Sequence, residues 1–455
     1  MNIVILGAGK FGLELCRQLT DEGHNITVID KNPAIADRAT DDFDVMGISG
    51  DGMDIDVLQE AGANKADIFI ATMQEDEINM VSALFAKKLG ADHVIARVRN
   101  PLYSHQTAFM REEMGISIMV NPEFESAVEI SRMLKFPQAT HVETFAKGRV
   151  ELAEVKVLEN SPIANLTLRE IGIKFKSRAL LCAVSRGENV YIPNGDFVIR
   201  EGDRICVAAS HTVLSEFLAE AGFIQNKIRS VMIIGCGAVG FYLARLLLDS
   251  GLKVKVIEKD RETLEKIAPL LPKAELIAAD GTNHQVLLEE GLLSEDALVA
   301  LTGVDEENII VSLFAKAQGV EKVIAKVNNT TLLPIARSLG LDSTITPKDV
   351  AADIISTYVR AKENAKENAK DSAVMTLYKL GGGSIEAIEF KAGSTGEYLG
   401  KKLKDLKLKE NSLIGAIVKG NKIIVPNGDS TIDAGDRVMV VTKDSHFGNL
   451  SELFN

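Results

Sequence analysis

Residues 2–30 read NIVILGAGKFGLELCRQLTDEGHNITVID, and residues 230–258 repeat the same order of features as SVMIIGCGAVGFYLARLLLDSGLKVKVIE. In each copy an apolar run typical of a strand leads into three glycines spaced G-x-G-x-x-G, then into a segment with helical periodicity. A second apolar run follows and ends in an acid. The glycines are Gly7, Gly9 and Gly12, then Gly235, Gly237 and Gly240, and the acids are Asp30 and Glu258. This order is typical of a dinucleotide-binding unit.

Each position of the motif has its own physical role. The first glycine permits a tight turn, the second lets a phosphate approach the backbone, and the third lets the helix pack closely on the strand. The free N–H groups and the positive dipole at the helix start attract a pyrophosphate. The acid accepts hydrogen bonds from ribose hydroxyls, which favours NAD over NADP. One such motif can serve helix packing alone, but two complete copies favour nucleotide binding.

Length and charge limit the classes of function. With 455 residues the chain is long for one core, which predicts two to four domains. The net charge of -13 argues against nucleic acid or anionic lipid as a direct partner, because both would be repelled. No apolar run approaches the roughly 18 residues of a membrane span, and the N-terminus enters a strand without a signal peptide. A cytoplasmic protein without direct lipid insertion is expected.

Cysteines and histidines indicate no metal or redox chemistry. The four cysteines form no CxxC pair, and each lies in an apolar segment, which is typical of buried reduced thiols. The seven histidines show no metal-ligand spacing. We therefore expect no metal site.

Strands alternate with helices after the first motif, which predicts an α/β fold with a doubly wound parallel sheet. The second half repeats this pattern. For example, DEINMVSALFAKKLG (76–90) matches DEENIIVSLFAKAQG (305–319). In such a sheet the ligand lies at the carboxyl ends of the strands, where the strand order reverses.

A smaller unit follows each α/β unit. Residues 179–209 match residues 412–442, with alternating apolar strands, a P-N-G-D turn and a G-D-R turn. Turn chemistry explains these residues, so we interpret them as structural. Before them, residues 161–173 match residues 394–408, and both segments are expected to form an amphipathic helix. The charged stretch 361–370, AKENAKENAK, is expected to be a solvated helical spacer.

The predicted organisation is two Rossmann-like domains, each followed by a small α+β domain. We expect their bounds at 1–135, 140–225, 229–360 and 372–455. This order and the duplicated motifs resemble the TrkA family of Trk-type potassium uptake regulators, whose RCK or KTN domains regulate potassium conductance. The resemblance covers essentially the whole chain, in the order N-lobe, C-lobe, N-lobe, C-lobe.

The resemblance implies a regulatory subunit and no enzyme. It implies binding of NAD(H), with ATP or ADP as the alternative, and gating of a membrane potassium-translocating subunit. It also implies a homo-oligomer, a dimer or tetramer ring, peripheral at the inner membrane face through that partner. Some relatives bind a cyclic dinucleotide or a cation in the C-lobes, and the residues leave this open here.

Site residues carry over position by position. The resemblance implies that Asp30 is the ribose ligand and that the first phosphate loop consists of Gly7, Ala8, Gly9, Lys10, Phe11 and Gly12. Asp51 and Asp280 follow the third strand of each unit, beside the adenosine, although a turn or helix-capping acid would look the same. Thr72 and Thr302 end the fourth strand. Arg97 and Lys326 end the fifth, where a surface ion pair is an equal interpretation.

The two copies differ at one loop position. Lys10 follows the second glycine of the first copy, and Ala238 stands there in the second. A cation beside the pyrophosphate adds a charge-assisted contact, so we expect tighter binding at the first site.

Two other functions are compatible with a dinucleotide-binding motif. An NAD-dependent dehydrogenase needs a substrate domain that brings an acid or base to the nicotinamide. Here only a short β-rich lobe follows each unit, and the duplication of a whole unit does not serve one active site. A regulatory module of another cation transporter would share every motif.

Overall fold

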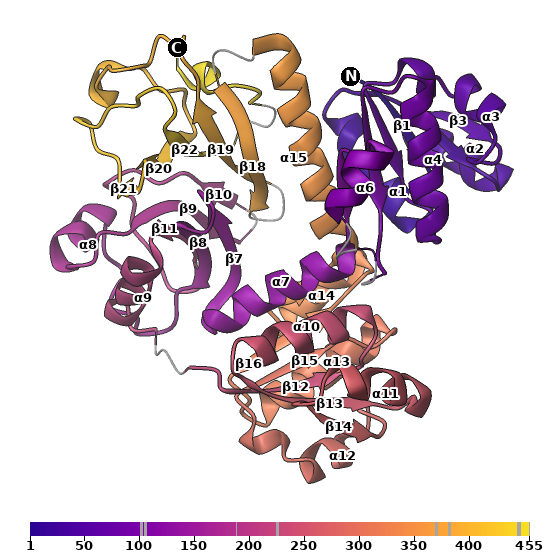
Figure 1. Cartoon of the computed structure of the whole chain (residues 1–455). Coiled ribbons are helices and arrows are strands. Elements are labelled where there is room, and N and C mark those ends of the chain that lie inside the picture. Colours follow the sequence, from indigo (N-terminus) through magenta and orange to yellow (C-terminus); the bar gives the residue numbers. More distant parts are fainter. Residues whose placement is uncertain are drawn as a thin grey trace. The chain divides into compact units, whose positions relative to one another are not determined.

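The computed structural model describes residues 1–100, 103, 107–187, 189–223, 227–368, 372–380, 384–443 and 447–454 (Figure 1). The chain divides into two compact units. Unit 1 contains Met1–Ser126 and Thr346–Val359, and unit 2 contains Ala127–Ile345 and Arg360–Asn455.

Unit 1 contains the first parallel sheet, in the order β3-β2-β1-β4-β5-β6. The order reverses between β1 and β4, which places a crevice at the carboxyl ends of these strands. The elements are β1 (Asn2–Leu6), α1 (Lys10–Asp21), β2 (Asn25–Asp30), α2 (Pro33–Asp42), β3 (Met46–Ser49), α3 (Ile55–Glu60), β4 (Ile68–Ala71), α4 (Asp76–Leu89), β5 (His93–Arg97), α6 (Thr107–Met114), β6 (Ile118–Val120) and α7 (Pro122–Lys135). The α/β fold with a doubly wound parallel sheet is confirmed.

A helix from the far end of the sequence completes unit 1. Helix α15 (Pro347–Asn368) follows the second parallel sheet in sequence, yet its residue Ile355 shares one core with Leu15 and Leu19 of α1. The hydroxyl of Ser356 donates to the side-chain oxygen of Gln18 at 3.1 Å, and both residues are buried. Residues of this helix up to Val359 belong to unit 1, and those from Arg360 onward belong to unit 2. The domain boundary expected at residue 360 stays a proposal.

Unit 2 contains the second parallel sheet, in the equivalent order β14-β13-β12-β15-β16-β17. Residues of α7 from Ala127 onward also belong to unit 2. The elements of this sheet are β12 (Ser230–Ile234), α10 (Ala238–Asp249), β13 (Lys253–Glu258), α11 (Arg261–Ile267), β14 (Glu275–Ala278), α12 (His284–Glu289), β15 (Ala297–Ala300), α13 (Asp305–Ala317), β16 (Lys322–Lys326), α14 (Leu333–Ser338) and β17 (Thr344–Ile345).

Two antiparallel sheets form the C-lobes of unit 2. Their orders are β10-β9-β11-β8-β7 and β18-β19-β22-β20-β21, which match when one is read backwards. The first lobe contains β7 (Ala139–Phe145), β8 (Val150–Lys156), α8 (Leu168–Lys174), β9 (Leu180–Arg186), β10 (Asn189–Tyr191), β11 (Arg204–Ala209) and α9 (His211–Glu220). The second contains β18 (Ser372–Leu380), β19 (Ile385–Ala392), η6 (Leu403–Asp405), β20 (Ser412–Lys419), β21 (Lys422–Ile424), β22 (Arg437–Thr442) and η7 (Leu450–Leu453).

The two C-lobe sheets share a core. Phe145, Leu152 and Cys182 of the first lobe pack in one cluster with Ala416 and Val441 of the second. The four cysteines of the chain are unpaired and buried, as expected. Apolar faces of the two sheets therefore cover each other.

One predicted helix is wrong. Residues 161–173 and 394–408 were both expected to be helical. The first copy forms α8, whose first turn is closed by a capping box between Thr167 and Glu170. The second copy forms only the 3-10 turn η6, and its capping residue Lys402 makes no side-chain capping bond. The loss of a cap weakens a short helix. The expected helical spacer is helical through Asn368, while residues 369 and 370 lie outside the described residues.

Replacing Ile355 by alanine tests the contribution of α15 to unit 1. Ile355 is 1% exposed, so Ile355→Ala removes buried methyl groups and should cost about 2–5 kcal/mol of unfolding free energy. Chemical denaturation measures the unfolding free energy of the variant and of the wild type. The matched control is Ile310→Ala on α13, where the side chain is 56% exposed and the cost should stay within about 0.5 kcal/mol. Equal effects of the two variants would contradict the assigned packing.

A buried lysine predicts a pH dependence of unit 2. The ammonium of Lys322 on β16 donates to the carbonyl of Ala139 at 2.5 Å and to the hydroxyl of Ser343 at 2.9 Å. Burial lowers the pKa of Lys322 from 10.5 to about 7, although Asp342 opposes this. Between these pH values the unfolded chain binds the proton and the folded chain does not, so stability should rise with pH. Lys322→Met should flatten this rise in thermal unfolding followed from pH 7 upward; an unchanged slope would contradict the lowered pKa.

Candidate nucleotide site

The first glycine loop has a tight turn, an open position and a close contact. Gly7 has a φ of +97°, which favours glycine. A methyl group on Gly12 would lie 1.8 Å from the carbonyl oxygen of Gly7, so no side chain fits there. A methyl group on Gly9 would meet no atom within 4 Å. The same three features recur at Gly235, Gly240 and Gly237. The structure thus leaves room for a ligand at the middle glycine.

The start of α1 is open as well. Gly9 caps this helix with an extended backbone and without a side-chain hydrogen bond, and Gly237 caps α10 in the same way. The first N–H groups of such a helix need acceptors from elsewhere. A phosphate or carboxylate supplies them and is favoured by the helix dipole. Lys10 and Ala238, the first residues of the two helices, are both exposed.

The terminal acid of the second strand holds the loop in both copies. In the first, one carboxylate oxygen of Asp30 accepts the N–H of Ala8 at 2.8 Å and the other accepts the N–H of Asn32 at 2.9 Å. In the second, Glu258 accepts the N–H groups of Cys236 at 2.7 Å and Asp260 at 2.9 Å. Each oxygen keeps a second lone pair, which can accept a ribose hydroxyl.

The acids expected beside the adenosine act as turn acceptors. Asp51 accepts the N–H of Met53 at 3.0 Å and lies 3.2 Å from the ammonium of Lys31. These contacts, that of Met53 first, lower the pKa of Asp51. Asp280 accepts the N–H and the hydroxyl of Thr282 at 2.9 and 2.7 Å, which lowers its pKa. A nucleotide contact by Asp51 or Asp280 stays a proposal.

Thr72 and Thr302 occupy different positions. Thr72 donates its N–H to the last residue of β1 at 2.8 Å, and Leu301 does the same to the last residue of β12 at 2.7 Å. Thr302 comes one residue later. The hydroxyl of Thr72 also bonds the carbonyl of Gly7 at 2.9 Å, whereas the hydroxyl of Thr302 bonds its own turn at Val304. Only the first copy therefore has a hydroxyl fastened to its glycine turn.

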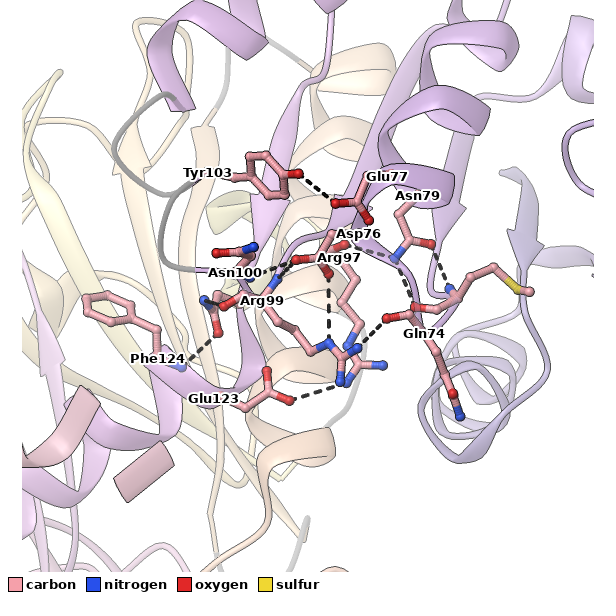
Figure 2. A network of polar contacts seen from close by, with 12 residues as sticks. Gln74, Asp76, Glu77, Asn79, Arg97, Arg99, Asn100, Tyr103, Glu123 and Phe124 are labelled. Carbon is pink, nitrogen blue, oxygen red and sulfur yellow. Dashed lines mark hydrogen bonds and ion pairs between the residues drawn. The ribbon is translucent and has the colours of Figure 1, made fainter. Parts of the chain in front are cut away.

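Two polar side chains at the start of α4 hold the loops that border the first crevice (Figure 2). Asp76 accepts the N–H groups of Arg99 and Asn100 at 2.9 and 2.7 Å. Asn79, which is fully buried, donates to the carbonyl of Arg97 at 2.9 Å. Asn79 also accepts the N–H of Met73 at 2.7 Å, so the loops after β4 and β5 are both fixed against the helix.

The second copy repeats this arrangement. Asp305 accepts the N–H groups of Asn328 and Asn329 at 2.9 and 2.7 Å, and Asn308 donates to the carbonyl of Lys326 at 3.0 Å. Our sequence reasoning missed Asp76, Asn79, Asp305 and Asn308. The available signal was D-E-x-N, which stands at 76–79 and again at 305–308.

Arg97 places a half-buried cation at the first crevice. Its guanidinium carbon lies 5.7 Å from the centre of the Phe11 ring, in the first turn of α1. One terminal nitrogen lies 3.4 Å from a carboxylate oxygen of Glu123 (Figure 2). Its Nε is buried and has no hydrogen-bond acceptor among the described residues. Burial lowers the pKa of Arg97, which stays charged. The donor set fits an anionic ligand, and the equivalent Lys326 donates to the carbonyl of Leu301 at 3.2 Å.

Comparison with protein families identifies the parts of the chain. The TrkA-N domain matches residues 3–122 and 231–347, and the TrkA-C domain matches residues 152–222 and 387–455. The chain belongs to the TrkA family. It is similar to the Trk system potassium uptake protein TrkA homolog of Archaeoglobus fulgidus, with 32% identity over 454 residues and 100% of both chains covered. The Trk system potassium uptake protein TrkA of Azorhizobium caulinodans is 28% identical over 461 residues, covering 100% of this chain and 98% of the relative.

Solved structures with the same fold include an RCK domain and a channel. The crystal structure of the GsuK RCK domain has a TM-score of 0.64 at 19% identity and covers 97% of this chain and 92% of its own. The GsuK channel bound to NAD has a TM-score of 0.64 at 20% identity, with 97% and 76% covered. This likeness shows the fold. Among the described residues of the present chain, no helix has the length and apolarity needed to cross a membrane.

Two glycine variants separate ligand access from loop folding. Gly9→Ala adds a methyl group to open space, so the unfolding temperature should stay unchanged while nucleotide affinity falls roughly tenfold or more. Gly12→Ala forces a contact with backbone and should lower the unfolding temperature. Calorimetric titration and thermal unfolding measure both. Unchanged affinity in Gly9→Ala would exclude this loop as the phosphate site.

Proposed function

We propose that the chain is the nucleotide-sensing regulatory subunit of a Trk-type potassium uptake system. The observation that carries this proposal is the duplicated glycine loop, which leaves a helix N-terminus open at a fold crevice and is held by a carboxylate with spare lone pairs. Membership of the TrkA family supports the transport context. The subunit would act on a membrane potassium-translocating partner and assemble with further copies into a dimer or tetramer ring.

NAD(H) is the proposed ligand of the first site, with ATP or ADP as the alternative. The N–H groups at the start of α1 suit a pyrophosphate, and Asp30 at the end of β2 suits a ribose. The related fold of the GsuK channel has been solved with NAD bound, which supports the same ligand class here. Asp51, Thr72 and Arg97 would border the bound nucleotide. The second site would use Glu258, Asp280 and Thr302.

The proposed mechanism is a shift between conformations, without consumption of the nucleotide. A ligand changes a conformational equilibrium only by the difference of its affinities for the two states. Helix α1 begins at the glycine loop and shares a core with α15. A ligand that moves the start of α1 therefore acts on the helix that packs against it. A dehydrogenase would need a substrate domain, and a small antiparallel lobe follows each parallel sheet here, which favours regulation.

Binding and transport experiments test this function. Purified protein is titrated with NADH, NAD, ATP and ADP in parallel, and then copurified with a membrane potassium transporter whose flux is measured with each nucleotide. We expect saturable binding and a flux that depends on the nucleotide. Turnover of NADH in a substrate screen would reject the regulatory function, and flux through a different cation transporter alone would assign another partner.

The two sites should differ in affinity. Lys10, the hydroxyl of Thr72 and Arg97 are present only in the first copy. Asp30→Ala should therefore weaken total nucleotide binding more than Glu258→Ala, and Lys10→Ala should lower first-site affinity by roughly tenfold, the scale of one charge-assisted contact. Calorimetry of each variant measures this. A larger loss from Glu258→Ala would reverse the ranking.

A further inference from the structure

A cavity of about 530 Å³ lies in unit 2, on residues that belong to neither glycine loop. Helix α7 and the edge strand β7 border it from the first half of the sequence, and β18, β19 and β22 border it from the second. The lining residues are Arg132, Thr144, Lys147, Gly148, Met375, Thr376, Tyr378, Glu389 and Arg437. The volume is in the range of small-molecule sites.

The lining is rich in positive charge and in hydrogen-bond donors. Three of its side chains are cations, Arg132, Lys147 and Arg437, and the one acid is Glu389. Glu389 is already engaged, because it pairs with Arg437 at 2.5 Å and accepts the N–H of Ala146 at 2.8 Å. Its negative charge therefore balances Arg437. Arg132 lies 3.7 Å from the carboxylate of Glu143, which leaves Lys147 as the lining cation without a carboxylate partner among the described residues.

Lys147 stands on a strained turn that faces the cavity. The hairpin between β7 and β8 (Val150–Lys156) contains two successive non-glycine residues in the left-handed region, Ala146 at φ 52° and Lys147 at φ 61°. Such residues each cost about 1 kcal/mol or more and persist where the surroundings hold them. Here the bond from Ala146 to the buried Glu389 holds the turn. Lys147 and the N–H groups of Lys147 and Gly148 have no partner within the described residues.

Arg132 contacts a polar network of Glu143, His141 and Glu129. Its guanidinium lies 3.7 Å from a carboxylate oxygen of Glu143, and His141 bridges Glu143 at 2.7 Å and Glu129 at 3.1 Å. The carboxylate and imidazole atoms of Glu129, His141 and Glu143 that could bind a metal lie within 4.8 Å of one another, a proximity that the sequence did not predict. Both ring nitrogens already bond a carboxylate, and Arg132 stands beside them. The network therefore orients Arg132, and we assign no ion to it.

We propose that this cavity binds a small phosphorylated metabolite, with its phosphate on Arg132, Lys147 and the hairpin N–H groups. Phosphate oxygens accept several charge-assisted bonds at once, and arginine and lysine are the side chains that supply them. The hydroxyl of Thr144 adds a donor, whereas the hydroxyl of Thr376 donates to Glu389 at 3.3 Å. Met375 and Tyr378 offer a less polar wall for the rest of the molecule. The cavity exceeds the size of phosphate alone, so the organic part should add affinity.

Titration of the full-length protein with inorganic phosphate and with glucose 6-phosphate tests this site. We expect saturable binding of both in calorimetry, with glucose 6-phosphate the tighter. Lys147→Gln removes an exposed charge that has no partner, so it should leave the unfolding temperature unchanged and weaken both ligands by roughly fivefold or more. Lys147→Glu should abolish binding. The matched control is Lys422→Gln, an exposed lysine on β21 outside the cavity, which should bind as the wild type does.

Three results would overturn the proposal. The first is wild-type protein without saturable binding of either probe. The second is equal affinity in Lys147→Gln and Lys422→Gln. The third is phosphate binding that survives Lys147→Glu and disappears in Asp30→Ala, because that pattern assigns the phosphate to the glycine loop. Nucleotide titration of Lys147→Gln should be unchanged, so failure of this site leaves the nucleotide-sensing function intact.

Discussion

A hydrogen bond from the glycine loop to the acid at the end of the second strand fixes the loop of the proposed nucleotide site. Asp30 accepts the N–H of Ala8, and Glu258 accepts the N–H of Cys236. Without such an acceptor the N–H would be left without a partner beside the crevice, and the loop would lose its fixed position above β1. Because the bond uses one lone pair of a carboxylate oxygen, the same acid stays able to bind a ribose. One acidic side chain can therefore both fix the glycine loop and bind a ribose hydroxyl.

Around that shared bond the two copies have diverged. The first crevice combines an exposed Lys10, a threonine hydroxyl on its glycine turn and the half-buried Arg97. In the second, an alanine, a leucine and a lysine stand at these positions, and that lysine bonds a backbone carbonyl. The loops that border both crevices are nevertheless held by the same Asp and Asn pair on the following helix. The scaffold is conserved between the copies, while the charge presented to an anion is not.

The C-lobes show how duplication creates surfaces that neither copy contains alone. Their sheets cover each other with one apolar core, and strands β7 and β18 come from opposite halves of the sequence. The polar cavity arises where cations from both halves border one volume. Glu389 connects the halves there, because it receives the N–H of Ala146 from the first lobe while it pairs with Arg437 of the second.

The sequence by itself determined the α/β class, the two glycine loops, the terminal acids and the family resemblance. These features are local: strand, turn and helix lie within one short segment, where spacing and side-chain size limit the backbone. It did not reveal that Leu301, one residue before Thr302, is the counterpart of Thr72, because that depends on strand pairing. It also predicted a helix at 394–408 from apolar spacing, where a cap was missing. Only the tertiary structure decided that α15 packs on the first sheet and that Arg132, Lys147 and Arg437 line one cavity. Such contacts join residues hundreds of positions apart, and long-range packing leaves no periodic signal in either segment.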